Sequence, residues 1–219
     1  MKWNVPNILT MIRLFCTPIV AVLFLVDIPF GIGVLVALGV YILACITDFL
    51  DGYIARKYNL ITDFGKFMDQ IADKAITTTA MILVLTIGEV TVSWLAVLMI
   101  LIVVLRDTII SGIRMVAANK GIVIAADIFG KIKSFFLDVG SMVLMLYVGL
   151  RGCLTNGADA TIGAMPIDYI KYFGLAIVIV GVVLSIISLI NYSVKAISAF
   201  KEKSREEEVK AEIEEKKDK

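Results

Sequence analysis

The stretch DFLDGYIARKYNLITDFGKFMDQIAD, residues 48–73, joins two apolar segments, at about 30–50 and 70–88, and carries five aspartates, two at each end and Asp63 between them. A helix that crosses a bilayer core needs about 20 mostly apolar residues, and both segments meet that length. If both are helical, the first two aspartates stand at i and i+3 and the last two at i and i+4, so each pair shares one helix face. A short connection makes the two helices antiparallel neighbours, and the four carboxylates are expected to converge. They belong to Asp48, Asp51, Asp69 and Asp73.

Four converging carboxylates at a membrane edge need positive charge nearby, because an unpaired charge in hydrocarbon is costly. Part of it can come from the neighbouring basic residues Arg56, Lys57, Lys66 and Lys74. Oxygen donors at this density favour Mg²⁺, Mn²⁺ or Ca²⁺, and two ions that share carboxylates would clamp and activate phosphoryl oxygens. The small residues Gly52, Ala55 and Gly65 leave space for a bulky group beside the metals, although such residues also pack helices in membranes.

The whole chain has the composition of a membrane protein. Of its 219 residues 59% are hydrophobic, against roughly 45–50% in a soluble domain, and the mean hydropathy is +0.92. The chain has no histidine, which excludes histidine acid–base catalysis, Ser–His triads and HExxH zinc sites. The predicted fold is an all-α membrane bundle with six transmembrane helices. Its spans are expected at about 8–27, 30–50, 70–88, 92–113, 129–150 and 167–194.

The basic residues predict the orientation of these spans, because Lys and Arg concentrate on the cytoplasmic side. The other side carries only Arg151 and Lys171. Both termini and the aspartates are therefore expected at the cytoplasmic face of the cell membrane. A catalytic domain is predicted for 1–199 and a charged cytoplasmic tail for 200–219. The cytoplasmic group comprises Lys2, Arg13, Arg56, Lys57, Lys66, Lys74, Arg106, Arg114, Lys120, Lys131 and Lys133.

The aspartate stretch resembles the signature of the CDP-alcohol phosphotransferases, DxxDGxxAR followed by eight residues and GxxxDxxxD. All eight fixed positions match over 26 residues. The resemblance implies a six-span homodimer that displaces CMP from a CDP-linked lipid by attack of an alcohol on the β-phosphorus. It makes the four aspartates ligands of Mg²⁺ or Mn²⁺, with two ions expected, and Asp73 the proton acceptor as well. It assigns Gly52, Ala55, Arg56 and Gly65 to the CDP-lipid site.

Three further cytoplasmic segments resemble the branch of this family that uses CDP-diacylglycerol and glycerol 3-phosphate. They are Val5–Arg13, Arg106–Arg114 and Gly130–Ser134; Asp107 and Ser134 stand where many members have Glu and Thr. The dianionic acceptor phosphate needs cations, and the candidates are Arg114, Lys131, Lys133 and Arg106, with Arg106 expected to pair with Asp107. The two lysines are two residues apart, so at most one is expected to reach substrate. Asp138 is expected to pair with a neighbouring helix and has no assigned role.

Two alternatives remain open at this stage. Within the family, the acceptor would be inositol phosphate, serine or phosphatidylglycerol. Inositol phosphate also needs a cationic pocket for its phosphate, so basic residues alone do not distinguish it from glycerol 3-phosphate. In a different class, the chain would be a divalent-cation transporter, since carboxylates within membranes often mark ion paths. A transporter is expected to carry acids near the midplane of several spans, whereas these cluster at one interface. The expected partners are the two substrates, membrane lipid and a second copy of the chain, with no nucleic acid.

Overall fold

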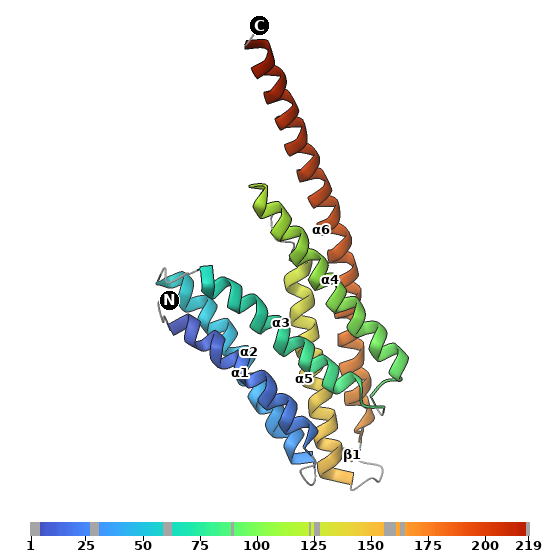
Figure 1. Ribbon diagram of the computed structural model, residues 1–219. Helices are drawn as coiled ribbons and strands as arrows, with labels where there is room; N and C mark the ends of the chain where they lie inside the picture. The colour runs from blue at the N-terminus through green and yellow to red at the C-terminus, as the bar shows by residue number, and fades with distance from the viewer. Residues whose placement is uncertain are drawn as a thin grey trace.

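The computed structural model describes residues 5–26, 31–58, 63–88, 90–122, 124, 128–155, 161–162 and 165–217. Within these ranges the chain forms six α-helices and one pair of two-residue antiparallel strands. The helices run alternately up and down, so the start of α1, the end of α2 and the start of α3 lie toward the same end (Figure 1). The elements are α1 (Val5–Leu25), α2 (Ile32–Lys57), α3 (Asp63–Leu85), α4 (Ser93–Asn119), α5 (Ile128–Thr155), β1 (Thr161–Ile162), β2 (Met165–Pro166) and α6 (Asp168–Lys217).

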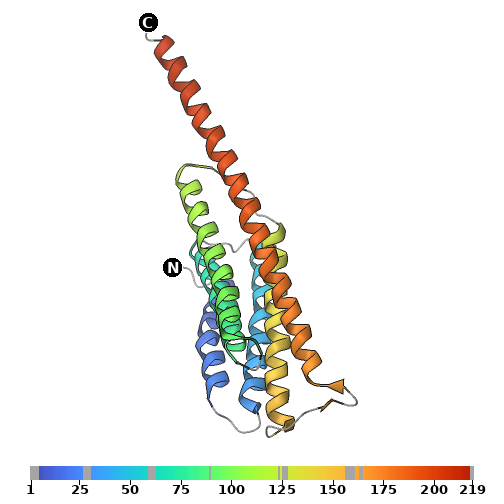
Figure 2. The same ribbon diagram turned by 90° about the vertical axis from the view of Figure 1, so that its right-hand side faces the viewer.

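Helix α5 is the centre of the bundle. It packs along α6 and also contacts α2 and α3, while α4 lies against α6 (Figure 2). Helix α1 packs along both α2 and α3 on the other side. The expectation that α2 and α3 are close neighbours is only partly right, because they make few direct contacts with each other. The two acid-bearing helices are therefore held mainly by α1 and α5.

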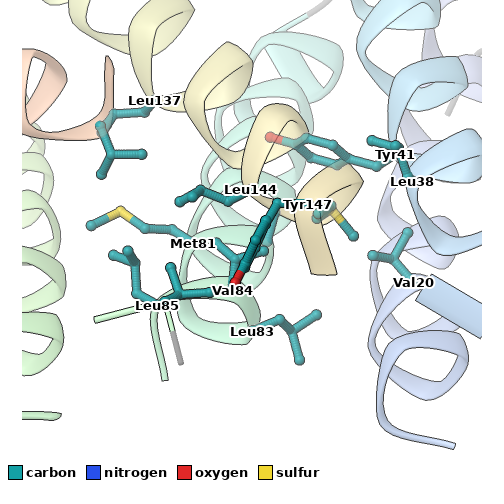
Figure 3. Packing of buried hydrophobic residues seen from close by; sticks show 14 of the residues in the cluster. Val20, Leu38, Tyr41, Met81, Leu83, Val84, Leu85, Leu137, Leu144 and Tyr147 are labelled. Atoms are coloured by element: carbon teal, nitrogen blue, oxygen red, sulfur yellow. The ribbon is translucent and has the colours of Figure 1, made fainter. Parts of the chain in front are cut away.

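The core consists of large apolar side chains contributed by several helices. Tyr41, Met81, Val84, Leu144 and Tyr147 are essentially inaccessible to solvent and lie together in Figure 3. Because lipid cannot hydrogen-bond backbone groups, a spanning chain satisfies them within helices, and helix packing then depends on close van der Waals contact. The core provides that contact between α2, α3 and α5.

Glycine allows the closest approach between helices. An added Cβ at Gly140 of α5 would lie 2.6 Å from Val178 Cγ2 of α6, and one at Gly181 of α6 would lie 2.8 Å from Leu137 Cδ2 of α5. Both distances are below van der Waals contact, so a larger residue would push the helices apart. Gly31, which precedes α2, has a φ of +68° that favours glycine.

Four described helical segments are long and apolar enough to cross a membrane, and Ile32–Asp48 is a shorter apolar helix. Many large apolar side chains on the outer faces of these helices are exposed, among them Phe15, Trp94 and Ile187. Such a surface suits lipid as the solvent. The all-α prediction is confirmed, and the chain is a multi-pass membrane protein. The four segments are Asn7–Leu25, Ser93–Asn119, Ile128–Leu154 and Asp168–Arg205.

Candidate active site

Arg13 of α1 joins the two acid-bearing helices. Its side chain is only 1% exposed, and Nη1 donates to Asp48 Oδ1 on α2 and, at 3.2 Å, to Asp69 Oδ1 on α3. The two carboxylate side chains remain 44% and 49% exposed. Two acids from different helices thus converge on one positive group at the edge of the bundle.

Asp73 lies one helical turn beyond Asp69 on α3 and is half-buried. Its carboxylate lies close enough to Asp48, Asp69 and Arg13 to interact with their charges. Three of the four predicted acids therefore share one electrostatic environment, as the spacing of the sequence motif predicts. The fourth, Asp51, belongs to α2, but its side chain lies outside the described part of the chain.

The predicted CDP-lipid residues are divided between α2 and α3. Gly52 and Gly65 are half-buried on these helices. The side chains of Ala55, Arg56 and Lys66 lie outside the described residues, so their predicted roles remain predictions.

The sequence alone does not identify Arg13 as the basic partner of the aspartates, and the predicted candidates include Lys57 and Lys74. Lys74 donates instead to α4, to Ser111 Oγ and, at 3.4 Å, to the backbone oxygen of Asp107. Lys57 is exposed and lies 5.7 Å from the ring centroid of Tyr58. The available signal for Arg13 was its place within an apolar segment, where an arginine needs a carboxylate partner. Its carboxylate partners lie on two other helices, α2 and α3, and the spacing of residues along one helix does not show which residues of other helices it contacts.

A second polar cluster centres on Asp107 of α4. Its carboxylate accepts hydrogen bonds from Arg106 at 2.6 Å and from Lys133 of α5 at 2.7 and 2.9 Å. Arg106 also donates to Ser188 Oγ of α6 at 2.5 Å. The predicted pairing of Arg106 with Asp107 is confirmed, whereas the bond from Lys133 was not predicted. The cluster joins α4, α5 and α6.

Gly130 makes room for this cluster at the start of α5. An added Cβ would lie 2.8 Å from Arg106 Nη2, which donates to Ser188 Oγ, while Nη1 of the same guanidinium donates to Asp107 Oδ1, so the group is held in place. The glycine of the predicted Gly130–Ser134 segment therefore has a steric reason within the described structure.

The four candidate cations for the acceptor phosphate fall into two kinds. Arg106 and Lys133 are buried and paired, at 8% and 3% exposure. Lys131 is exposed, so the two lysines lie on different faces of α5, as their spacing predicts. Arg114 is exposed near the end of α4, with its guanidinium carbon 5.7 Å from the ring centroid of Tyr192.

Comparison with known proteins places this chain in a family. Residues 3–199 match the family described as CDP-alcohol phosphatidyltransferase. The chain belongs to that family. It is 32% identical over 155 residues to the CDP-diacylglycerol–glycerol-3-phosphate 3-phosphatidyltransferase of Bacillus subtilis, covering 66% of this chain and 78% of that protein. Proteins of the same name are similar to it in Salmonella choleraesuis (31% over 194 residues, 88% and 94% covered) and Cereibacter sphaeroides (35% over 152 residues, 69% and 67% covered).

CDP-alcohol phosphatidyltransferases generally use divalent metal ions. Among the described residues, no three acidic, histidine or cysteine side chains are grouped closely enough to hold a metal ion, and the side chain of Asp51 is not among them. The donor chemistry nevertheless fits. Asp48 and Asp69 direct carboxylate oxygens toward one cationic group, and carboxylates are the ligands that Mg²⁺ and Mn²⁺ prefer.

Proposed function

We propose that this phosphatidyltransferase moves the phosphatidyl group of CDP-diacylglycerol to glycerol 3-phosphate, giving phosphatidylglycerol phosphate and CMP. The substrates are those in the printed names of its relatives. The structural observation that best supports the proposal is the convergence of Asp48 and Asp69 on Arg13, because it gathers acids from two helices where a pyrophosphate and its metals need them.

The proposed metal ligands are Asp48, Asp51, Asp69 and Asp73, for two ions of Mg²⁺ or Mn²⁺. When bound, such ions would neutralise the pyrophosphate and stabilise the departing phosphate. Arg13 would keep Asp48 and Asp69 close together in the absence of metal, since it supplies a positive charge between them. Gly52, Ala55, Arg56 and Gly65 are proposed to receive the CDP moiety.

The proposed reaction is a single displacement. The hydroxyl oxygen of glycerol 3-phosphate forms a bond to the β-phosphorus, the bond from that phosphorus to the CMP oxygen breaks, and the hydroxyl proton passes to Asp73. A carboxylate is the natural acceptor in a chain without histidine. The half-buried place of Asp73 beside Asp48 and Asp69 supports this role.

The acceptor phosphate is proposed to bind among Arg106, Arg114, Lys131 and Lys133. Because Asp107 accepts hydrogen bonds from both Arg106 and Lys133, a phosphate would have to compete with that carboxylate for them. Arg114 and Lys131 are exposed and can reach an incoming anion without breaking an ion pair with Asp107. Arg114 is therefore the first candidate for a direct contact.

The test is an acceptor assay with purified enzyme and radiolabelled CDP-diacylglycerol. Glycerol 3-phosphate is expected to release CMP and give labelled phosphatidylglycerol phosphate, while inositol phosphate, serine and phosphatidylglycerol give little product. Efficient use of one of those three instead would reassign the acceptor within the family. If none of the four acceptors leads to CMP release, the glycerol 3-phosphate proposal is rejected and the acceptor alcohol is unassigned.

The membrane arrangement is also a proposal. Six spans with both termini and the acids in the cytoplasm suit the asymmetry of basic residues and the alternating direction of the helices. The catalytic domain is proposed to be 1–199, followed by a charged tail at 200–219, in a homodimer at the cell membrane.

A further inference from the structure

Asp138 of α5 is an acidic residue deep in the bundle that the proposed reaction does not use. Its Oδ1 accepts hydrogen bonds from Tyr41 of α2 at 2.9 Å and from Thr77 of α3 at 2.8 Å. The prediction that it pairs with a neighbouring helix is confirmed. It contacts both acid-bearing helices at once, and Figure 3 shows Tyr41 beside α5.

Each of the two donors lies on the same helix face as one of the site aspartates. Tyr41 precedes Asp48 by seven residues, so both lie on one face of α2 two turns apart. Thr77 follows Asp73 by four residues and lies one turn away on the same face of α3. A shift of either donor along or around its helix would move the corresponding carboxylate with it.

Few other contacts fix α2 against α3. The two helices touch each other little, and the described polar links between them pass through other helices. Arg13 of α1 joins Asp48 to Asp69 at the edge of the bundle, and Asp138 joins Tyr41 to Thr77 within it. Two cross-links at different depths restrict both the separation and the tilt of a helix pair, which one cross-link cannot do.

A carboxyl group at this depth is an expensive way to join two helices, because apolar packing would do so without desolvating a charge. Its two hydrogen bonds offer instead a fixed direction and length, which apolar contacts lack. Metal catalysis needs ligands held to within a fraction of an ångström, and groups behind the ligands commonly provide that precision.

We propose that Asp138 is a positioning residue that holds Tyr41 and Thr77 together and so sets the separation of Asp48 on α2 from Asp73 on α3. The proposal rests on the proposed function in one respect, that these two aspartates bind metal. Asp138 itself touches neither metal nor substrate in this account.

The first test measures helix position without metal or activity. Nitroxides would be attached at the exposed positions Leu50 and Phe67, next to the acids, in a full-length chain whose three cysteines are replaced by alanine. Tyr41→Phe, Thr77→Val and Asp138→Leu are each expected to broaden or shift the interspin distance measured by EPR. Thr86→Val and Tyr169→Phe remove exposed hydroxyls elsewhere and are expected to leave it unchanged.

The second test measures metal binding and turnover in the unlabelled enzyme. Tyr41→Phe and Thr77→Val are each expected to raise the Mn²⁺ concentration for half-saturation, followed by the EPR signal of free Mn²⁺, about 3- to 10-fold. This is less than the roughly 10- to 100-fold typical of groups bonded directly to a metal ligand, because Tyr41 and Thr77 bond Asp138 instead. kcat is expected to fall while the KM for glycerol 3-phosphate changes little. Asp138→Asn keeps an acceptor oxygen for Tyr41 and Thr77, so its Mn²⁺ half-saturation and kcat are expected to be closer to those of the wild type than the values for Asp138→Leu.

The double variant Tyr41→Phe/Thr77→Val separates a link from two independent contacts. A link fails when either end is broken, so the double variant is expected to bind Mn²⁺ hardly more weakly than the worse single variant. Additive losses would overturn the proposal, as would an Asn variant as impaired as the Leu variant. Unchanged interspin distances and Mn²⁺ binding in both single variants would overturn it too. Undiminished Mn²⁺ binding and turnover in Asp48→Asn would instead reject the metal site, whatever the interspin distances show.

Discussion

Arg13 is almost fully buried, yet the two carboxylates that it contacts are about half exposed. A cation in this position reduces the repulsion between Asp48 and Asp69. Its ion pairs with Asp48 and Asp69 make Arg13 part of the packing that holds α1, α2 and α3 together. This gives Arg13 a role in stability that can be separated from catalysis.

Arg13→Ala is expected to lower the free energy of unfolding by about 2 kcal/mol in metal-free detergent. Removing one partner of a fully buried ion pair lowers the free energy of unfolding by about 3–5 kcal/mol. The loss expected here is smaller because water screens the two half-exposed carboxylates. The loss should shrink when Mn²⁺ is added, because the metal supplies the missing positive charge. Thermal unfolding with and without Mn²⁺ measures both effects. Lys201→Ala, at an exposed site, is the control, and an unchanged Tm for Arg13→Ala without metal would contradict the account.

The metal mechanism is tested on the aspartates directly. Asp48→Asn, Asp51→Asn and Asp69→Asn are each expected to lower turnover at least about 100-fold, in line with the loss of a strong electrostatic stabiliser. EDTA should abolish the activity of the wild type, and Mg²⁺ or Mn²⁺ should restore it. Turnover that persists in excess chelator would rule out the metal-dependent reaction.

Asp73 and Arg114 are expected to affect different kinetic constants. Asp73→Asn should reduce kcat severely, since it removes interactions made mainly in the transition state. Arg114→Ala should raise the KM for glycerol 3-phosphate and leave that for CDP-diacylglycerol nearly unchanged, with some loss of kcat. Arg114→Lys should raise the KM for glycerol 3-phosphate less than Arg114→Ala does but should not restore the wild-type value, because lysine lacks the bidentate fork of arginine. A two-substrate kinetic matrix in micelles measures these constants, and a higher KM for CDP-diacylglycerol alone would move the acceptor site elsewhere.

Helical spacing predicts that Asp48 shares a face with Asp51 and Asp69 with Asp73, and the short connection between the two helices predicts that Asp48 and Asp69 converge. The sequence does not predict Arg13 as their partner or Lys133 as the partner of Asp107, since both pairs depend on how separate spans pack. Asp138 lies between these cases. The cost of its charge predicts that a partner exists, but only the packing of α5 identifies Tyr41 and Thr77.

At the scale of helices, each predicted span falls within an observed helix or overlaps most of it. Helix α3 begins at Asp63, well before the apolar segment predicted from residue 70, and α4 continues to Asn119 beyond the predicted end at 113. Hydropathy marks only the part of a helix that suits lipid. The backbone hydrogen bonds continue into polar residues outside it, which carry much of the candidate site.

The orientation of the helices can be tested by thiol labelling. In a background without Cys16, Cys45 and Cys153, a cysteine at Lys57 or Lys120 should be protected from an impermeant reagent in intact cells. A cysteine at Asn156 should be labelled, because the basic residues predict that its connection faces outward. The same cysteines in opened membranes provide the control for reactivity. The reverse pattern would separate the acids from cytoplasmic glycerol 3-phosphate and contradict the proposed topology.

At the scale of the whole molecule, the proposed homodimer predicts a protein mass of about twice 24.0 kDa in mild detergent. Membrane helices associate through close packing and buried polar contacts rather than through the hydrophobic effect, so the detergent must preserve the lateral contacts. Light scattering coupled to size exclusion separates the protein mass from the micelle. A single-chain mass that keeps full activity would contradict a functional dimer.

Helix α6 continues without a break for 50 residues, about 75 Å at a rise of 1.5 Å per residue, and its last part extends beyond the other helices (Figure 1). The part from residue 201 to 217 alone spans about 25 Å. A fluorescent protein or affinity tag fused to the C-terminus would therefore stand clear of the acids. One fused to the N-terminus would sit near the start of α1, only two turns from Arg13. The C-terminus is the better place for a reporter. Energy transfer from a fluorophore there to an acceptor dye in the membrane would measure how far the end of α6 stands above the membrane surface.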